Sequence, residues 1–498
     1  MSYPSFLWSG ELTPDTEREP STPETTLEDL IGDKEIRARS LPLLRCPCSG
    51  AEIAARQQLF RAMLDEAGFE EKIRAIEEQI SETERLYGEL ERAETEEEKV
   101  LLFLPLMIRF FDVAREIAGL DSESGRAGEI GGYWRGVIDD PTVKMTEKRC
   151  RDVMAKRDDA VKLTIHGWET HIWERRDGMR DKLEKMLRDM GMEDAIPQGR
   201  QPARALPSVV GGYADVYNGY YGMAESFWKD YSTRYLGGED DLAPLFLYLP
   251  ELHFMIDCTA YFKTLREAGY PLTYPEVTSR REFILSGVVD PSLHRRGIPG
   301  TEVVPNDLEM RGDKLNFYIL SGANGGGKTT FLRACSLAAL FFSVGCPIAA
   351  RSGRGMPFDA VYTHFPSNES FENSGRFADE SARADEILAA ATENSFAVFN
   401  ETYSGTDEKR SEEYSAKLAH AMFDAGVFGI YVTHIHSLTG GEIPTLAAMI
   451  DEADENRRTY KIRRVGGTSS SFARDILEKY GLDSDSLEKK LDKMKGGA

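Results

Sequence analysis

The chain has 498 residues, enough for about three domains of ordinary size, and 41% of them are hydrophobic, so packed cores are expected. A formal net charge of -23 excludes a protein that is basic over its whole surface, but not one with a local basic path to nucleic acid. No apolar run approaches the roughly 18 residues of a membrane span, and the N-terminus does not resemble a signal peptide. We therefore expect a cytoplasmic protein with no membrane partner.

The first half of the chain is predicted to be helical after an acidic start. Residues 1–33 hold eight acidic residues and one basic residue and are rich in Pro, a composition that predicts a flexible acidic N-terminal arm. From residue 34 to about 125, apolar side chains recur at three- and four-residue spacing, most clearly between Phe69 and Leu90. The close pair Cys46 and Cys48 lacks the further ligands of a zinc site, so we interpret both as reduced thiols.

The rest of this half is more charged. Residues 126–145 are interpreted as a Gly-rich connection, and residues 144–190 as a long helical arm whose mixed bases and acids favour a solvated face over a nucleic-acid surface. An aromatic-rich helical stretch then continues to about residue 268. Prolines and short β-rich runs begin near residue 270, where we place the main domain boundary.

From residue 315 onward, apolar β runs alternate with helical segments. The β runs are NFYILSG, SFAVF and GIYVTH, and helices are expected from residue 328 and from about residue 412. This alternation predicts a mostly parallel sheet with helices on both faces. The expected fold class is therefore an α/β C-terminal domain preceded by an all-α helical domain.

A phosphate-binding loop is predicted directly after the first of these β runs, where the sequence fits G-x-x-x-x-G-K-[ST]. Glycines let the backbone turn so that its N–H groups face phosphate oxygens, and the helix from Lys328 adds its positive end. We expect Lys328 to reach the β- and γ-phosphates of ATP, and the Thr329 hydroxyl to bind Mg²⁺. The predicted nucleotide-binding residues are Gly322, Ala323, Asn324, Gly325, Gly326, Gly327, Lys328, Thr329 and Thr330.

Two later strands add the remaining candidates. SFAVF is followed by Asn400 and Glu401, and a nucleotide hydrolase needs one group to orient magnesium and a carboxylate to activate water. Glu401 is the candidate base. Asn400 stands where an Asp is usual, and it keeps one oxygen for Mg²⁺, through water, while losing a charge. His434, after the next strand, is expected to meet the γ-phosphate or the attacking water.

A further anion site is predicted between these strands. Ser374 and Gly375 read as a helix start, with Ser374 as the N-cap and apolar residues following at helical spacing. A helix N-terminus attracts anions. Whether it meets its own nucleotide or that of a second subunit stays open at this point.

Taken together and in order, these pieces resemble the MutS family of DNA mismatch repair ATPases. The matching stretches are VPNDLEM, LSGANGGGKTTFLRACSLAAL, FADESARADEILAAATENSFAVFNETYSGTD, YVTHIHSL and TYKIRRVGGTSSSFARDILEKYGL. RRTYKIRR (457–464) is accordingly interpreted as the last strand and not as a nucleic-acid patch. The resemblance implies a helical core and lever-like domain at 34–268, an ATPase domain at 269–485 and a charged C-terminal tail at 486–498.

The resemblance also implies an ABC-type P-loop ATPase that uses ATP and Mg²⁺ and works as a homodimer. In that family each nucleotide lies between one subunit's loop and the other subunit's signature helix. Ser374, Gly375 and Arg376 would then form the trans signature, with Gly375-Arg376-Phe377 in place of the family's S-T-F and Arg376 as a cationic contact.

The implied function is an ATP-dependent clamp on duplex or branched DNA, acting in DNA repair or recombination. The core-like stretch begins by residue 40, without the family's mismatch-reading and connector domains before it, so direct mismatch reading is not expected. Two alternatives stay open. One is a ribosome- or RNA-associated ATPase of the same family. The other is a nucleotide-gated structural dimer that hydrolyses ATP slowly. Asn400, in place of the usual Asp, is the feature that favours this alternative.

Overall fold

In the computed structural model the chain divides into two compact units, and each is described by itself. The helical unit comprises Met1–Thr16 and Ala67–Leu252, and the sheet unit comprises Glu17–Glu66 and His253–Ala498. The structure describes residues 3–9, 11–12, 20–31, 42–120, 125–159, 162–166, 169–173, 203–204, 207–312, 314–365, 373–403, 408–450 and 458–465. The predicted C-terminal tail at 486–498 lies outside these residues.

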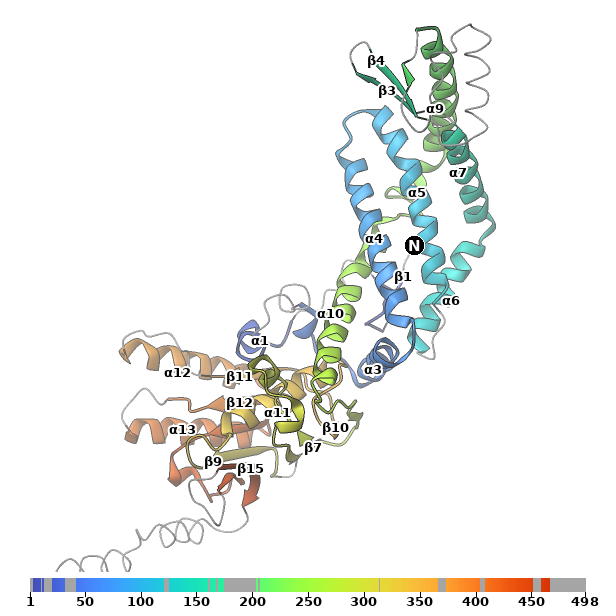
Figure 1. Ribbon diagram of the computed structural model, residues 1–498. Coiled ribbons are helices and arrows are strands. Elements are labelled where there is room, and N and C mark those ends of the chain that lie inside the picture. Colours follow the sequence, from blue (N-terminus) through green and yellow to red (C-terminus); the bar gives the residue numbers. More distant parts are fainter. Residues whose placement is uncertain are drawn as a thin grey trace, which may run out of the picture. The chain divides into compact units, whose positions relative to one another are not determined.

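The helical unit is built around α5 (Figure 1). Its long helices are α4 (Phe69–Arg92), α5 (Glu96–Ala118), α6 (Gly125–Asp139), α7 (Pro141–Asp159) and α9 (Pro207–Tyr235). The helix α5 packs against the other four, and most of its apolar side chains are buried. It starts with a capping box, in which the Thr95 side chain accepts from the Glu98 N–H and Glu98 reaches back to the Thr95 N–H.

The first residues of the chain belong to this unit. Strand β1 (Tyr3–Pro4) pairs with β2 (Glu11–Leu12), and the Tyr3 and Phe6 side chains are buried. The Phe6 N–H donates to Glu251 Oε2 at 2.8 Å. The prediction of a flexible arm is therefore wrong for residues 3–8, because aromatic side chains anchor them despite the acidic composition around them. It is also wrong for residues 24–30, which form a partly buried helix of the sheet unit.

Two further predictions for this half are wrong. Residues 126–145 form α6 and the start of α7, and a Cβ at Gly131 would lie 2.2 Å from Leu120 O, so that glycine permits a close approach instead of a turn. Strand β3 (Lys162–His166) pairs with β4 (Glu169–Trp173), and β4 pairs with β5 (Ala203–Arg204), in an antiparallel sheet. Polar and apolar residues alternate with period two in β3, the pattern of a strand, and with these strands the unit is not all-α.

The sheet unit contains a six-stranded sheet with the order β11-β12-β13-β9-β14-β15. Its strands are β9 (Phe317–Ser321), β11 (Val361–His364), β12 (Phe396–Asn400), β13 (Phe428–Val432), β14 (Thr445–Ile450) and β15 (Arg458–Val465). Neighbouring strands are parallel except β14 and β15, which are antiparallel. The predicted mostly parallel sheet is confirmed, and so is the interpretation of residues 457–464 as its last strand.

Helices connect and cover these strands. The buried helix α11 (Lys328–Ser343) contacts β11, β12 and β13 and also β7 of a second, four-stranded sheet. That sheet has the order β6-β10-β7-β8 and consists of β6 (Glu276–Val277), β7 (Glu282–Val288), β8 (Asn306–Arg311) and β10 (Ser352–Gly355). The helices α12 (Asn373–Ala390) and α13 (Glu408–Asp424) share one apolar cluster with alternate residues of β9 and β12 and with Tyr431 of β13.

The sheet unit also includes α1 (Glu24–Leu30), α3 (Gly50–Asp65) and the second part of α10 (Tyr248–Glu267). Helix α3 is fixed by side-chain hydrogen bonds, from Arg56 Nη1 to Val344 O at 3.1 Å and from Gln57 Nε2 to Pro275 O at 2.8 Å. The division of the chain thus differs from the predicted boundary, since it falls within α10 and leaves Glu17–Glu66 with the sheets. None of the helices in the described ranges is long and apolar enough to span a membrane.

Candidate nucleotide-binding site

Three connections meet at one edge of the six-stranded sheet. The glycine-rich loop follows β9, Glu401 follows β12 and His434 lies two residues after β13. Because these strands are parallel and β13 lies between the other two, their carboxyl ends share an edge, the usual place for ligands in such sheets. The fold therefore assembles Lys328, Glu401 and His434 from parts of the sequence that are far apart.

The backbone of the loop requires its glycines. Gly322, Gly325 and Gly327 have φ angles of 132°, 71° and 88°, which other L-residues adopt only with strain. A Cβ on Gly326 would lie 2.9 Å from Ala323 O, within the loop itself. Of the other predicted loop residues, Ala323 and Asn324 are exposed and Thr330 is half-buried. The sequence pattern therefore corresponds to a backbone that glycine alone fits well.

Lys328 is the first residue of α11 and is buried within the curve of the loop. Its Nζ donates to Gly322 O at 2.8 Å and to Ala323 O at 3.2 Å. Burial lowers the pKa of Lys328, and the nearby Glu401 carboxylate partly opposes this change. The loop thus holds a single ammonium group close to its own peptide groups.

Thr329 and Asn400 supply neutral oxygen atoms at the same edge. Thr329 Oγ1 donates to Asn400 Oδ1 at 3.3 Å. In the described part of the chain, no group of three or more His, Cys, Asp or Glu side chains is arranged to hold a metal ion. This donor set fits Mg²⁺ in its common form, in which one or two protein oxygens act together with phosphate oxygens and water.

Glu401 and His434 form the polar pair beside the loop. His434 Nε2 lies 2.8 Å from Glu401 Oε1, and both side chains are partly open to solvent. Glu401 has a φ of 54°, and its N–H donates to Val432 O at 3.0 Å. The carboxylate is thus held by a backbone turn and by an imidazole, with one side facing solvent where a water molecule has access.

The predicted trans signature lies at the start of α12. Ser374, Gly375 and Arg376 are in its first turn, and the helix begins at Asn373, one residue before the predicted N-cap. The side chains of residues 373–377 lie outside the described part of the structure. Their relation to a nucleotide therefore stays a prediction.

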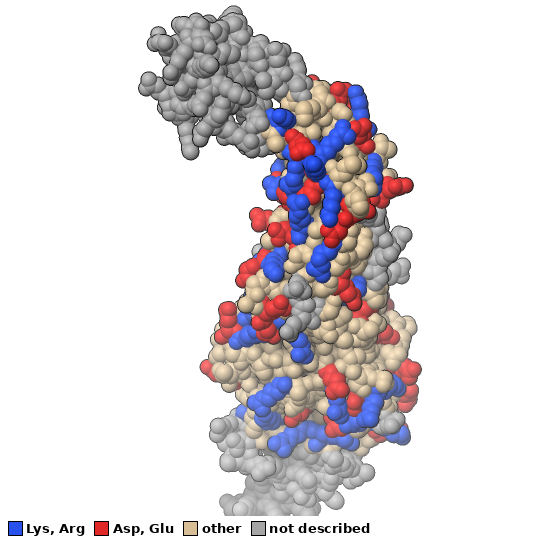
Figure 2. Space-filling view, turned by 90° about the vertical axis from the view of Figure 1, so that its right-hand side faces the viewer, with Lys and Arg blue, Asp and Glu red and all other residues tan. Residues whose placement is uncertain are grey.

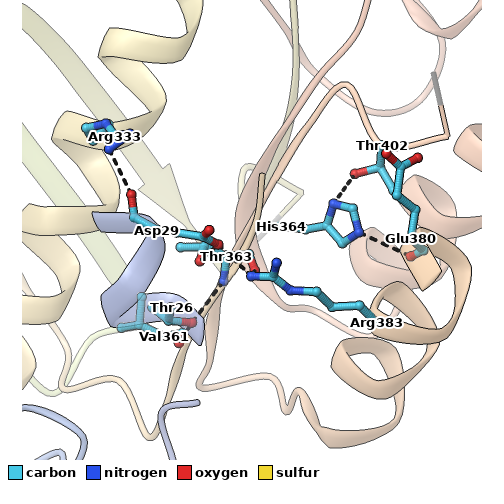
Figure 3. Close-up of polar contacts among 9 residues, drawn as sticks. All are labelled: Thr26, Asp29, Arg333, Val361, Thr363, His364, Glu380, Arg383 and Thr402. Atoms are coloured by element: carbon cyan, nitrogen blue, oxygen red, sulfur yellow. Dashed lines mark hydrogen bonds and ion pairs between the residues drawn. The ribbon is translucent and has the colours of Figure 1, made fainter. Parts of the chain in front are cut away.

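A second polar cluster, which the sequence patterns did not indicate, lies between α1, β11 and α12 (Figure 3). Asp29 Oδ2 accepts from Thr363 Oγ1 at 2.7 Å and from Arg383 Nη2 at 2.5 Å. His364, at the end of β11, is buried. In the sequence, Thr-His ends β11 just as Thr-His follows β13, but this parallel assigns His364 no partner and no role.

The helical unit presents mixed charge on the face in Figure 2, where Lys and Arg side chains are interspersed with Asp and Glu. Basic residues of α7 have acidic neighbours: Arg149 pairs with Asp230 at 2.7 Å, and Arg151 with Asp112 at 2.6 Å. This pairing agrees with a solvated face. Residues 174–190 of the predicted arm lie outside the described ranges.

Fold and site together define an α/β domain whose candidate site is a glycine-rich loop at the edge of a mostly parallel sheet. The sequence profile of MutS domain V matches residues 318–478, which include the loop, Glu401 and His434. The C-terminal half of this chain therefore contains a region similar to domain V of MutS proteins.

Similar proteins match the same half of the chain. A DNA mismatch repair protein MutS of Thermus thermophilus is 28% identical over 203 residues, 40% of this chain and 24% of that protein. The MutS of Geobacillus kaustophilus is 25% identical over 256 residues, covering 49% and 28%. Endonuclease MutS2 of Lactococcus lactis is 28% identical over 226 residues, covering 44% and 28%. The chain thus spans about a quarter of the length of the relatives it matches.

Proposed function

We propose that this protein is an ATP-dependent DNA-binding protein of the MutS type, a dimeric ATPase clamp in DNA repair or recombination that does not read mismatches directly. The observation that carries the proposal is the meeting of Lys328, the Thr329–Asn400 pair and the Glu401–His434 pair at one sheet edge. The similarity to MutS proteins supports the link to DNA repair, because the matched relatives are named for mismatch repair or as endonucleases.

In the proposed reaction the loop N–H groups and Lys328 hold the phosphates of ATP. Glu401 takes a proton from the attacking water. The water oxygen bonds to the γ-phosphorus while the bond between that phosphorus and the β–γ bridging oxygen breaks. His434 holds the Glu401 carboxylate and faces the same water. Thr329, and Asn400 through water, would hold Mg²⁺, which would supply positive charge to the phosphates.

The dimer follows from the same proposal. Ser374, Gly375 and Arg376 would approach the γ-phosphate bound by a second copy of the chain, where the N-terminus of α12 provides unpaired N–H groups and a partial positive charge. ATP would then join two sheet units, and hydrolysis would release them. The helical units of the dimer would enclose or contact duplex or branched DNA.

Nucleotide binding is tested first. We expect Lys328→Ala to abolish binding of a fluorescent ATP analogue at concentrations that saturate the unmodified protein, because the loop then lacks its only charge aimed at phosphate. The matched control is Lys417→Ala, which removes an exposed lysine paired with Glu413 on α13. Equal affinity in the two variants would contradict the assignment of the loop.

DNA binding is tested separately, by titrating duplex and branched DNA with the ATP-bound protein at several salt concentrations. Phosphate contacts release counterions, so affinity is expected to fall steeply as salt rises. Absence of binding even at low salt would contradict the DNA part of the proposal while leaving the ATPase part intact.

A second candidate is an ATPase that acts on a particle of RNA and protein such as the ribosome. The interspersed charges of Figure 2 favour it, because such a partner brings its own protein surface. Co-sedimentation with ribosomes, compared with binding to free DNA, separates the two candidates. A slowly hydrolysing structural dimer is the third, and it would show ATP-dependent dimerisation with little turnover.

A further inference from the structure

His364 lies at the carboxyl end of β11 and is 1% exposed (Figure 3). Its Nε2 is 3.1 Å from Glu380 O, and its Nδ1 is 3.0 Å from Thr402 Oγ1. A backbone carbonyl only accepts hydrogen bonds, so Nε2 carries the proton and Nδ1 accepts from the threonine hydroxyl. Burial, with help from the Arg383 charge, lowers the pKa of His364 to about 4, which agrees with a neutral ring.

The hydroxyl that His364 holds belongs to the residue directly after Glu401. Thr402 is held a second time, because Tyr431 Oη donates to Thr402 O at 2.9 Å. The residues on either side, Glu401 and Tyr403, have φ angles of 54° and 68°, in the left-handed region that residues with a side chain seldom adopt. Such a conformation persists only where surrounding contacts fix it, and the His364 and Tyr431 contacts are of that kind.

The other side of the imidazole faces α12. Glu380 O belongs to that helix, and one turn further Arg383 Nη2 donates to Thr363 O at 2.8 Å. The last two residues of β11 are therefore both bonded to α12. His364 connects two elements, the helix that begins with the predicted trans signature and the turn that carries Glu401.

We infer that His364 is a positioning residue for ATP hydrolysis. It accepts a hydrogen bond from the Thr402 hydroxyl and donates one to Glu380 O. These two bonds connect the turn that carries Glu401 to α12 and keep Glu401 facing His434. The inference rests on the proposed function, since Glu401 needs a fixed position only if it serves as the base. Nothing in the sequence patterns around His364 assigns it a role. The plainer reading is a core histidine that stabilises the fold and leaves the reaction unaffected.

Substitution of His364 by each of the two amide residues tests the two hydrogen bonds of the ring separately. The oxygen of Asn is attached at the same distance along the side chain as Nδ1, so His364→Asn keeps an acceptor for Thr402. The NH₂ of Gln corresponds to Nε2, so His364→Gln keeps the donor to Glu380 O. Thr402→Val removes the hydroxyl at constant shape, and Thr402→Ser keeps it.

The four variants are compared with the unmodified full chain for kcat, KM and equilibrium binding of the ATP analogue with Mg²⁺. We expect His364→Gln and Thr402→Val to lower kcat by about 10- to 100-fold, as for a displaced catalytic group, with binding changed less than about 2-fold. His364→Asn and Thr402→Ser should keep most of kcat. The His364→Gln/Thr402→Val double variant should be no slower than either single variant, because both remove the same contact.

Several results would overturn the inference. One is a kcat unchanged in both His364→Gln and Thr402→Val, and another is a larger loss in His364→Asn than in His364→Gln. If the unmodified chain binds ATP but does not hydrolyse it, the proposed function fails first. Nitrogen NMR of the chain with labelled histidines then tests the His364–Thr402 hydrogen bond independently of hydrolysis. The inference requires a neutral His364 ring that is protonated at Nε2 and whose Nδ1 signal shifts in Thr402→Val. A ring protonated at Nδ1 would overturn it.

Discussion

Thr329 and Asn400 meet across the candidate site, where the Thr329 hydroxyl donates to Asn400 Oδ1 at 3.3 Å. One residue comes from the first turn of α11 and the other from the last position of β12, so the contact joins the phosphate loop to the strand that leads into Glu401. An aspartate at position 400 would offer the same oxygen together with a full negative charge. This difference sets the first prediction.

We expect Asn400→Asp to lower the Mg²⁺ concentration needed for half-maximal ATP hydrolysis by about 10-fold, because a carboxylate attracts the cation and its bound water more strongly than an amide. The measurement is the ATPase rate as a function of free Mg²⁺. Asn394→Asp adds the same charge at an exposed position before the amino end of β12 and serves as the control. An unchanged Mg²⁺ requirement would remove Asn400 from the magnesium side of the site.

We expect Glu401→Gln to retain ATP binding and to lower kcat by about 100-fold or more, since an amide does not accept the proton of the attacking water. ATP should then hold the protein in the dimeric state, which light scattering would detect. Glu386→Gln, on the exposed face of α12, is the matched control. Turnover at the unmodified rate would show that Glu401 is not the base.

The contacts of Asp29 predict that the start of the chain stabilises the sheet unit. Its carboxylate bonds to Thr363 and Arg383, and its backbone carbonyl accepts from Arg333 Nη1 of α11 at 2.8 Å. Asp29→Ala should therefore lower the free energy of unfolding of this unit by about 1–3 kcal/mol, as for other partly buried charged hydrogen bonds. Glu28→Ala, exposed on the same helix, should change it by less than about 0.5 kcal/mol. Urea unfolding curves of the two variants make the comparison, and equal midpoints would contradict the prediction.

The buried ring of His364 predicts a pH dependence of stability. The pKa of His364 is about 4 in the folded chain, against an ordinary value of 6.5, so between these values the unfolded chain binds a proton that the folded chain does not. The contribution of the neutral His364 ring to the free energy of unfolding is therefore complete above about pH 6.5. It is lost as the pH falls toward 4, by roughly 3 kcal/mol over that interval.

The measurement for this prediction is the urea midpoint of the sheet unit at pH 7 and pH 5. The unmodified chain should lose more stability over that interval than His364→Asn, which has no titrating ring. Equal losses in the two proteins would mean that the ring is accessible to protons in the folded state.

The sequence predicted the parts of this protein whose signals are local. The run β9, loop and α11 is recognisable because an apolar strand, a set of glycines needed for positive φ and a helix follow one another directly. The strands before Glu401 and His434 were also recognisable, as short apolar runs that end in a polar residue.

The roles of Asp29 and His364 had no such signal, because each depends on partners that the chain brings together from elsewhere. Asp29 meets Arg383 across more than 350 positions, within an acidic segment whose composition alone suggested disorder. The strands β3 and β4 were missed for a different reason. Charged residues are dense around them, and only β3 alternates polar and apolar residues with period two.

The position of β13 between β9 and β12 has a consequence for the size of the site. Two steps between adjacent strands separate the strand of the loop from the strand of the carboxylate, about 10 Å. Gly429 of β13 maintains this width, because a Cβ there would lie 2.0 Å from Ala397 O of β12. A larger residue at 429 would push β12, and with it Glu401, away from the loop. The width of the gap in which the proposed reaction takes place therefore depends on the absence of a side chain at position 429.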